Sequence, residues 1–445
     1  MKEMTETPRV LIFGQPFNNL TGGGITLSNL FKGWPRDKLA VVATGHVLYY
    51  ASPDMCDNYY QLGDEEHKWK FPFSLFQRRF TSGEKKFAAH NEVPANKNIS
   101  SLRFNFVNHV FYPALSWLGL IHLSSKISLS EKLKDWIHGY QPDVLYIQVY
   151  NRETINFCRE LESYLKIPSA IHFMDDWPST ICTSGIFRRY WQRIIDSELK
   201  QLLDSIDVHL AISEAMAEEY EIRYNKKFIA FHNPIDLKAW LPHTKTDFSL
   251  GKAYINCLYS GRIGIGIAES VIEVASAIDD LNNDGFNIEF HIQTPTEEEN
   301  ILAMLRKKSC VRINPLAQYS KLPEIFSSAD ILILANDFDI NGITYLKYSM
   351  PTKASEYMIS GTPVLLYAPE QAAVFKTFYA NGCAYCLSRN GKDEIKNALM
   401  FLIGNQEYRQ QISRKAVDYA RKFFDAEIVR SAFQNIFINL IKKSN

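Results

Sequence analysis

Short runs of apolar residues alternate with amphipathic segments along most of the chain. Most of these runs are continuously apolar, which is typical of parallel strands that are buried on both faces of a sheet. Several of the intervening segments carry apolar residues at helical spacing. The predicted strands cover residues 10–13, 40–43, 144–148, 169–173, 208–212, 255–259, 288–292, 331–335, 363–367 and 384–387. This alternation predicts an α/β protein with two doubly wound domains in tandem.

The length agrees with two domains, because 445 residues exceed the roughly 100–200 that one domain usually holds. The turn-forming segment His232–Asp236 contains an Asn-Pro pair and follows a predicted strand. We therefore expect a first domain over residues 1–235 and a second over 236–425. An amphipathic helix over 426–445 has no strand after it, so its apolar face must pack against one of the domains.

Composition and charge exclude several classes of protein. The formal net charge is zero, which gives no reason to expect nucleic-acid binding. The apolar run at 10–13 is too short for a signal peptide, and residues 111–123 fall short of the roughly 20 that a membrane span needs. We therefore expect a cytoplasmic protein. Cys383 and Cys386 form an isolated pair, whereas a zinc site needs about four ligands, so no metal site is expected.

Residues 49–127 break the alternation and suggest an insertion in the first domain. The segment mixes aromatic and basic side chains: Lys68, Trp69, Lys70, Phe71, Phe73, Phe76, Arg78, Arg79, Phe80, Lys85 and Lys86. Such a mixture suits peripheral contact with the inner face of a membrane, to which residues 111–123 could add an apolar face. Packing in the first domain's core, or around an acceptor pocket, explains the aromatic residues equally well.

Two groups of residues in the first half of the chain are candidates for chemistry. Gly22, Gly23 and Gly24 follow the first strand, where glycines let backbone N–H groups approach a ligand. A tight turn is the alternative, but it does not require three consecutive glycines. His172, Asp175 and Asp176 surround the end of the strand at 169–173, where ligands of α/β sheets bind. They could perform acid–base catalysis, or one carboxylate could cap a short helix.

Two further groups lie in the second half. Gly261-Arg262 follows the strand at 255–259, and an arginine on a glycine turn suits a diphosphate. Gly261–Gly266 also suggests a dinucleotide loop, but Glu269 stands where its third glycine belongs.

Residues 351–364 predict a helix with Thr352 as its N-cap, which places Lys353 and Glu356 one turn apart. Lysine can bind phosphate and glutamate can bind the paired hydroxyls of a ribose. A surface ion pair is the alternative.

In this order, the four motifs resemble those of the family 4 retaining glycosyltransferases of bacterial polysaccharide assembly, over nearly the whole chain. Residues 175–178 resemble the family's HD-x-WP segment, with Asp175 in place of histidine. His232–Asp236 resembles its x-N-x-x-D signature, and residues 351–364 match P-S/T-K-x-x-E-Y-M-x-x-G-x-P-V. Two other departures are Tyr348, where the family usually has the first of two paired glutamates, and Ile267, where it commonly has lysine.

The resemblance implies the GT-B fold, in which two Rossmann-like domains face each other and a last helix returns to the first. It also implies a nucleotide diphosphate sugar as donor, a glycan or lipid-linked glycan as acceptor in capsule or lipopolysaccharide assembly, anomeric retention, and no metal or other cofactor. The implied donor-binding residues are Gly261, Arg262, Lys353, Glu356 and Tyr357. The expected catalytic residues are His172, Asp175, Asp176, Arg262 and Lys353. Asp337, Asp339 or Asn341 could supply polar contacts to the sugar.

Three alternatives remain at this point. A nucleotide-sugar 2-epimerase shares the fold but needs no acceptor. An NAD-dependent oxidoreductase would use Gly261–Gly266 and would leave the Lys353–Glu356 helix without a purpose. A non-catalytic protein that binds sugar nucleotides would explain Tyr348 and Ile267. Release of nucleotide from a sugar donor distinguishes an enzyme from a binding protein.

Overall fold

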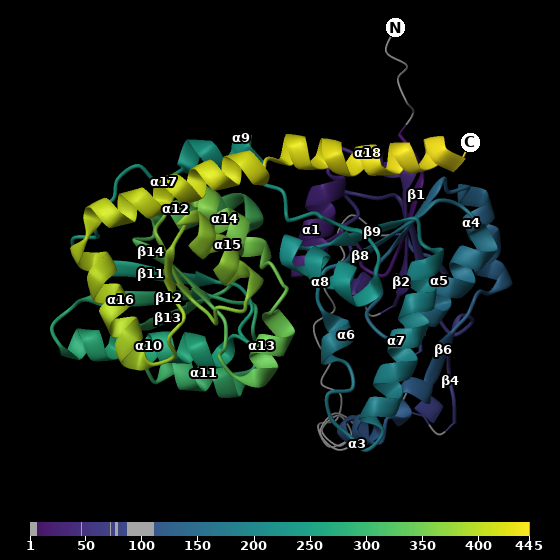
Figure 1. The fold of residues 1–445 in the computed structure, drawn as a ribbon, viewed down its shortest axis with the longest axis horizontal. Coiled ribbons are helices and arrows are strands. Elements are labelled where there is room, and N and C mark those ends of the chain that lie inside the picture. The colour runs from purple at the N-terminus through teal and green to yellow at the C-terminus, as the bar shows by residue number, and fades with distance from the viewer. Residues whose placement is uncertain (1–6, 46, 72, 76–78, 87–110, 445) are drawn as a thin grey trace, which may run out of the picture. The chain divides into compact units, whose positions relative to one another are not determined.

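The chain divides into two compact units. The computed structural model describes residues 7–45, 47–71, 73–75, 79–86 and 111–444. The first unit consists of Met1–Phe231 together with Arg430–Asn445, and the second of His232–Val429 (Figure 1). Phe76, Arg78 and residues 87–110 of the expected insertion lie outside the described residues.

The first unit is built on an eight-stranded sheet with the order β10-β9-β8-β7-β1-β2-β3-β5. Its neighbours are parallel except for β3 and β5. The strands are β1 (Val10–Phe13), β2 (Leu39–Thr44), β3 (Asn58–Leu62), β5 (Gly83–Glu84), β7 (Val144–Ile147), β8 (Ser169–Phe173), β9 (Val208–Ala211) and β10 (Phe228–Ala230). The main helices are α1 (Gly22–Phe31), α4 (Glu131–Tyr140), α5 (Arg152–Leu165), α7 (Arg188–Ser205) and α8 (Glu214–Tyr224). The predicted doubly wound organisation is thus confirmed.

The segment 49–127 is only partly an insertion. Its strand β3 continues the main sheet, with Asn58 opposite Ala40 and Tyr59 opposite Val41. The remainder contains a separate antiparallel pair, β4 (His67–Trp69) with β6 (Ser125–Ile127), and the short helix α3 (Tyr112–Trp117). Strand β3 was not predicted because its sequence, Asn-Tyr-Tyr-Gln-Leu, is not a run of apolar residues. Tyrosine and glutamine supply much of its buried surface.

The second unit has a six-stranded, fully parallel sheet with the order β13-β12-β11-β14-β15-β16. Its strands are β11 (Ile255–Ser260), β12 (Ile288–Gln293), β13 (Val311–Asn314), β14 (Ile331–Ala335), β15 (Val364–Tyr367) and β16 (Tyr385–Leu387). One apolar core joins the sheet to α10 (Ala268–Asn283), α11 (Glu299–Arg306) and α16 (Lys392–Gly404). A second core joins it to α12 (Leu322–Ser328), α14 (Thr352–Ser360), α15 (Ala373–Asn381) and α17 (Gln406–Phe423).

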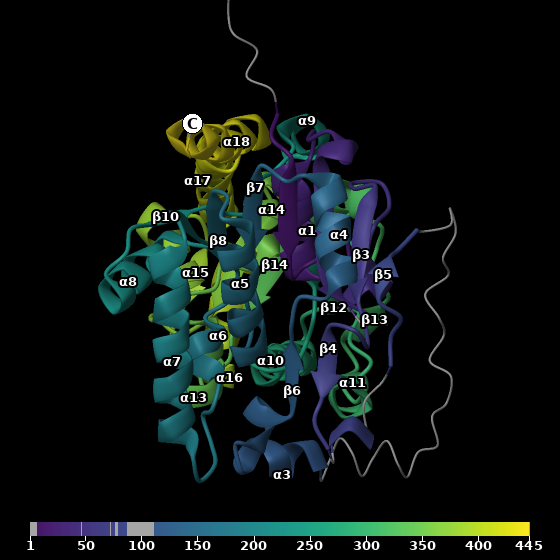
Figure 2. The same ribbon diagram turned by 90° about the vertical axis from the view of Figure 1, so that its right-hand side faces the viewer.

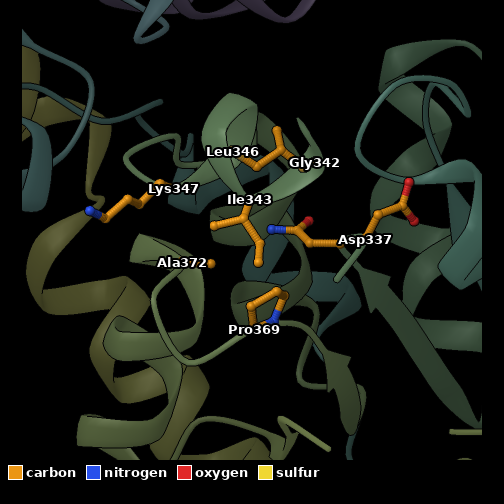
Figure 3. A pocket seen from close by; sticks show the side chains of 8 residues that line it. Asp337, Gly342, Ile343, Leu346, Lys347, Pro369 and Ala372 are labelled. Carbon is orange, nitrogen blue, oxygen red and sulfur yellow. The ribbon is translucent and has the colours of Figure 1, made fainter. Parts of the chain in front are cut away.

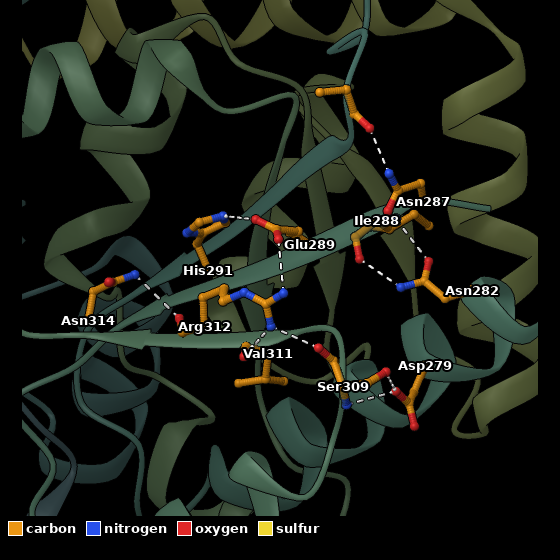
Figure 4. Close-up of polar contacts among 11 residues, drawn as sticks. Asp279, Asn282, Asn287, Ile288, Glu289, His291, Ser309, Val311, Arg312 and Asn314 are labelled. Atoms are coloured by element: carbon orange, nitrogen blue, oxygen red, sulfur yellow. Dashed lines mark hydrogen bonds and ion pairs between the residues drawn. The ribbon is translucent and has the colours of Figure 1, made fainter.

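Strand β12 is the exception to the continuously apolar pattern. Ile288, Phe290 and Ile292 are buried in the core with α10, whereas the alternate positions are only half-buried. On that polar face, the Glu289 carboxylate lies 3.0 Å from His291 Nε2 and 3.0 Å from the Arg312 guanidinium of β13 (Figure 4). The charged side chains near this edge of the sheet therefore neutralise one another.

The last helix, α18 (Ala426–Ser444), begins in the second unit and packs on the first. The rings of Phe433 and Phe437 lie 5.1 and 5.9 Å from the ring of Phe31 in α1. Arg430 Nε also donates a hydrogen bond of 2.6 Å to the carbonyl oxygen of Asn29. The expected return of the C-terminal helix is confirmed. Among the described helices, none is both long and apolar enough to cross a membrane.

Candidate functional site

The most densely charged group of candidate residues lies at the carboxyl end of β11 in the second unit. Gly261 follows β11 with a φ of +135°, a conformation that side chains rarely adopt. A Cβ at this position would lie only 3.0 Å from Lys353 Nζ. That Nζ in turn lies 3.8 Å from the centre of the Tyr259 ring, within range of a cation–π interaction. Glycine is therefore needed here both for its backbone conformation and for the approach of the lysine.

Helix α14 carries Lys353 and Glu356 to this strand end. The helix begins after Pro351, which makes no side-chain cap, so the expectation that Thr352 is the N-cap is wrong. Its first turn is held instead by Asn233, whose Nδ2 donates to the Thr352 carbonyl at 3.4 Å. The carbonyl of Asn233 accepts a hydrogen bond of 3.2 Å from the Ser355 hydroxyl. The boundary segment thus positions the helix.

Glu356 is a buried carboxylate with unused capacity to accept hydrogen bonds. The residue is 4% exposed, and its Oε1 accepts no hydrogen bond from any described residue. Burial raises the pKa of Glu356 to about 7, while the Tyr319 hydroxyl and the Lys353 charge act in the opposite direction. A buried acceptor without a donor costs free energy unless a ligand supplies the donor. Glu356 Oε1 is therefore available to accept hydrogen bonds from the hydroxyl groups of a ligand.

Lys353 and Arg262 form a pair of cations beside this carboxylate. Burial, with the nearby Arg262 charge, lowers the pKa of Lys353 to about 7, and Glu356 opposes the shift. The Arg262 side chain is exposed and forms no ion pair with a described residue. Its carbonyl is fixed by a 2.6 Å hydrogen bond from the Tyr259 hydroxyl. Two like charges held close together favour an anion between them.

Tyr357 differs from the expectation that it binds the donor. Its side chain is fully buried against Phe326, with the two ring centres 5.0 Å apart. Its hydroxyl accepts a 2.9 Å hydrogen bond from the backbone N–H of Ser260. Tyr357 therefore fixes α14 to the end of β11 and acts on a ligand only through the position of Gly261.

The expected sugar contacts are engaged in local structure. The Asp337 carboxylate accepts a 2.8 Å hydrogen bond from the Ser270 N–H, and burial raises the pKa of Asp337. Asp339 caps the short helix α13 (Ile340–Leu346) through the N–H groups of Asn341 and Gly342. A small pocket beside α13 is lined by Asn336, Asp337, Gly342, Ile343, Leu346, Lys347, Pro369 and Ala372 (Figure 3). Ile267 and Tyr348 are the two positions where the sequence lacks the family's usual lysine and glutamate. Ile267 is buried in the core, and the centre of the Tyr348 ring lies 4.8 Å from Lys347 Nζ.

In the first unit, Gly22, Gly23 and Gly24 form the first turn of α1 and serve different purposes. Thr21 caps α1 by accepting a hydrogen bond of 3.2 Å from Gly24 N–H. A Cβ on Gly24 would meet the Asn18 side chain at 2.1 Å, so packing alone requires that glycine. Gly22 and Gly23 are more accessible, and Gly23 has only ordinary contacts with Gln15. Local packing thus accounts for Gly24, and a ligand-binding role remains open for the other two.

The structure separates the three acid–base candidates after β8. His172 is 1% exposed and is hydrogen-bonded through Nδ1 to the Tyr146 hydroxyl at 2.7 Å. Burial lowers the pKa of His172 to about 3, so this histidine is a neutral core residue, contrary to the expected catalytic role. Asp176, also 1% exposed, accepts hydrogen bonds from Tyr220 at 2.7 Å and from Arg223 at 3.0 Å. The Asp176 carboxylate is thus engaged in a buried ion pair, and of the two aspartates Asp175 alone is exposed.

Three residues have roles at the site that the sequence motifs did not assign. Tyr259 supports Lys353, Tyr319 bonds Glu356, and Asn233 holds the first turn of α14. Asn233 carried a signal, because it belongs to the boundary segment. Tyr319 lies in a short 3₁₀ turn at Tyr319–Lys321, far from any motif.

Comparison with known proteins gives no match to a family model or to a curated sequence. Solved structures, by contrast, match over almost the whole chain. Sucrose-phosphate synthase from Thermosynechococcus elongatus has a TM-score of 0.61 at 10% identity, covering 98% of this chain and 100% of its own. Anabaena HepE in complex with UDP and glucose has a TM-score of 0.59 at 11% identity, covering 96% and 99%. The trehalose-phosphate synthase of Burkholderia xenovorans, in complex with glucose-6-phosphate, has a TM-score of 0.59 at 12% identity, with the same coverage.

Identities this low carry information about the fold alone. The structural match covers nearly all of this chain and of each of these structures, and ranges over both doubly wound units. The chain therefore has the GT-B fold.

Proposed function

We propose that the protein transfers a sugar from a nucleoside diphosphate sugar to a hydroxyl acceptor. The observation that carries the proposal is the buried, unpartnered Oε1 of Glu356 beside the cations Lys353 and Arg262. A nucleoside diphosphate presents a ribose diol one diphosphate away from the sugar, so it matches an acceptor group next to two positive charges. This position at the carboxyl ends of parallel strands is where ligands of α/β sheets bind.

In the reaction, the bond between the anomeric carbon and the diphosphate oxygen breaks. A bond forms between that carbon and the acceptor oxygen, and the proton of the acceptor hydroxyl passes to the departing diphosphate oxygen. The diphosphate leaves with additional negative charge, and Arg262 and Lys353 stabilise it. Groups already oriented toward developing charge commonly contribute the largest share of catalysis.

The finer assignments follow the resemblance in sequence and the nature of the structural neighbours. HepE has been solved with UDP and with UDP-glucose, which supports a sugar nucleotide as donor here. We propose retention of anomeric configuration, and a glycan or lipid-linked glycan of polysaccharide assembly as acceptor. Asp175 and the glycines Gly22 and Gly23 are the proposed acceptor contacts in the first unit. Two cations at the diphosphate also support a reaction without a metal ion.

The test is to incubate the purified protein with a panel of nucleotide sugars and to measure released nucleotide. Slow hydrolysis of one donor, retained in EDTA and lost in Glu356→Gln, is the expected result. Release of an epimerised sugar without acceptor would assign a 2-epimerase instead. Tight donor binding with no turnover, with or without candidate acceptors, would assign a binding protein.

A further inference from the structure

The first unit displays large apolar side chains around α3 that the donor site does not use. Trp117 is 52% exposed, Phe187 is 51% exposed and Phe71 is 80% exposed. Phe73, by contrast, packs against Phe111, with the two ring centres 6.3 Å apart. We use the name α3 surface for the surface formed by Phe71, Trp117, Leu120, Ile186, Phe187 and Tyr190.

Three segments that are distant in sequence build the α3 surface. The N–H of Ile186 donates a hydrogen bond of 3.0 Å to the Trp117 carbonyl. The N–H of Lys70 donates to the Ser124 carbonyl at 2.8 Å, at the end of the β4–β6 pair. Both ribbon views place α3 at one end of the first unit, near β6 (Figures 1 and 2). The apolar side chains therefore belong to one continuous part of the molecule.

Close contacts of backbone and side chains lie beneath the α3 surface. Gly185 has a φ of +100°, and a Cβ there would lie 2.2 Å from the Trp117 carbonyl oxygen, so only glycine permits this approach. Below it, the ring of Trp191 packs 5.1 Å from His122 and 5.2 Å from the Arg152 guanidinium, which is paired with Glu198. These contacts hold the segments that carry the exposed side chains.

The three segments that build the α3 surface carry basic residues and no acidic ones. Residues 67–71, 111–128 and 181–193 contain no acidic residue, and their lysines and arginines are Lys68, Lys70, Lys126, Arg188, Arg189 and Arg193. All six are exposed, and none forms an ion pair with a described residue. Lys68 and Lys126 stand directly opposite each other on β4 and β6. Like charges in cross-strand pairs destabilise a sheet, so this arrangement has a cost that a partner of opposite charge would remove.

We propose that the α3 surface binds the headgroup region of an anionic membrane. Aromatic side chains favour the interface between water and lipid, and lysines and arginines are attracted to anionic headgroups. A neutral apolar partner would leave the six positive charges without counterparts. An acidic protein would satisfy the charges but gives no reason for so many protruding aromatic side chains. The proposal does not depend on sugar transfer, because the α3 surface is separate from the donor site.

The experiment is flotation of the full-length protein with vesicles. One set contains phosphatidylcholine with about one third phosphatidylglycerol, and the other phosphatidylcholine alone. We expect binding to the anionic vesicles at about 0.05 M salt and at least tenfold weaker binding at about 0.5 M, where screening is strong. Equal binding to both vesicle types, or no flotation with anionic vesicles at low salt, would overturn the proposal.

Two pairs of variants locate the contact. Arg188→Glu with Arg189→Glu should weaken binding by more than twentyfold, because each positive charge at such a surface contributes about fivefold. Ile186→Ser with Phe187→Ser should also weaken it, and should do so at both salt concentrations. The matched controls are Lys227→Glu and Ile222→Ser at the end of α8, where both residues are exposed and Ile222 is 83% exposed.

The controls should float like the unaltered protein, and all variants should keep the unaltered far-ultraviolet circular dichroism. Equal losses in the control and α3-surface variants would show that the contact lies elsewhere. A protein that is dimeric in solution, and that becomes monomeric in Phe187→Ser without any loss of flotation, would assign the surface to self-association and refute the proposal.

Discussion

Lys353 Nζ lies between the ring of Tyr259, at 3.8 Å from its centre, and Gly261, where an added Cβ would lie at 3.0 Å. The lysine therefore reaches the end of β11 only because a flat aromatic face supports it and no side chain stands above it. Arg262 is the next residue, and Glu356 lies one turn further along α14. A single strand end thus organises the candidate donor site.

Replacing Gly261 with alanine should weaken nucleoside diphosphate binding by more than tenfold. The new methyl group must displace Lys353, and the φ of +135° adds a strain of about 1–3 kcal/mol. Gly391→Ala is the matched control, since its φ is +144° and nothing lies within 4 Å of an added Cβ. Calorimetric titration with UDP should show weak binding for Gly261→Ala and near-normal binding for Gly391→Ala. Similar affinities in both variants would contradict the prediction that the approach of Lys353 requires glycine at position 261.

Removing the carboxylate of Glu356 should weaken nucleoside binding by more than tenfold. The loss of charged hydrogen bonds to a buried diol costs on the order of 2 kcal/mol. Titrations of Glu356→Gln with UDP and with 2′,3′-dideoxy-UDP test the assignment. The unaltered protein should distinguish the two ligands, and the variant should not. If Glu356→Gln binds UDP as the unaltered protein does, the nucleoside lies elsewhere.

Nucleoside diphosphate binding should be accompanied by proton uptake at Lys353 near neutral pH, opposed by proton release at Glu356, whose pKa is also about 7 and whose carboxylate accepts the ribose hydroxyls. The pKa of Lys353 is about 7, so the lysine loses its charge as the pH rises through that value. A bound diphosphate favours the protonated form and raises this pKa, so the affinity should fall as the pH increases above about 7. Calorimetry in buffers of different ionisation enthalpy measures the protons directly. Lys353→Gln should reduce the uptake, whereas an unchanged value in this variant would assign the titration to another group.

The two adjacent aspartates should behave in opposite ways. Asp176→Ala leaves the Arg223 guanidinium and the Tyr220 hydroxyl without their buried partner, which should lower the free energy of unfolding by about 3–5 kcal/mol. Asp175→Ala changes an exposed residue and should leave stability within about 0.5 kcal/mol. Urea denaturation of both variants provides the comparison. A catalytic Asp176 would instead show lost turnover with little loss of stability.

The sequence predicted the regular parts of this structure because buried parallel strands leave a strong local pattern. The runs at 10–13, 331–335 and 363–367 became β1, β14 and β15 with their ends moved by at most one residue. Strand β3 was missed, since two tyrosines and a glutamine supply its buried surface. Helix α14 was predicted from its motif, but it begins at Thr352 directly after Pro351, so Thr352 is its first residue and not its cap.

The local sequence carried less information about individual side chains of the site. Nothing in the sequence distinguishes Asp176 from its neighbour Asp175. In the structure, Arg223, 47 residues later, donates a hydrogen bond to Asp176. His172 likewise reads as an acid–base residue until Tyr146 and the surrounding strands enclose it. In both cases, the residues that enclose the side chain are distant from it in sequence. Spacing alone reports which residues are near a strand end, but not which of them face solvent.

The return of α18 to the first unit has a consequence for the order of folding during synthesis. Phe433 and Phe437 contact Phe31 and Tyr146, so this part of the first unit's core lacks its final partners until the entire second unit has been translated. At roughly 5–20 residues per second, that delay is on the order of ten seconds or more. During it, the nascent chain exposes an aromatic groove that is a natural target for chaperones, and ribosomes stalled within the second unit would release a first unit prone to aggregation.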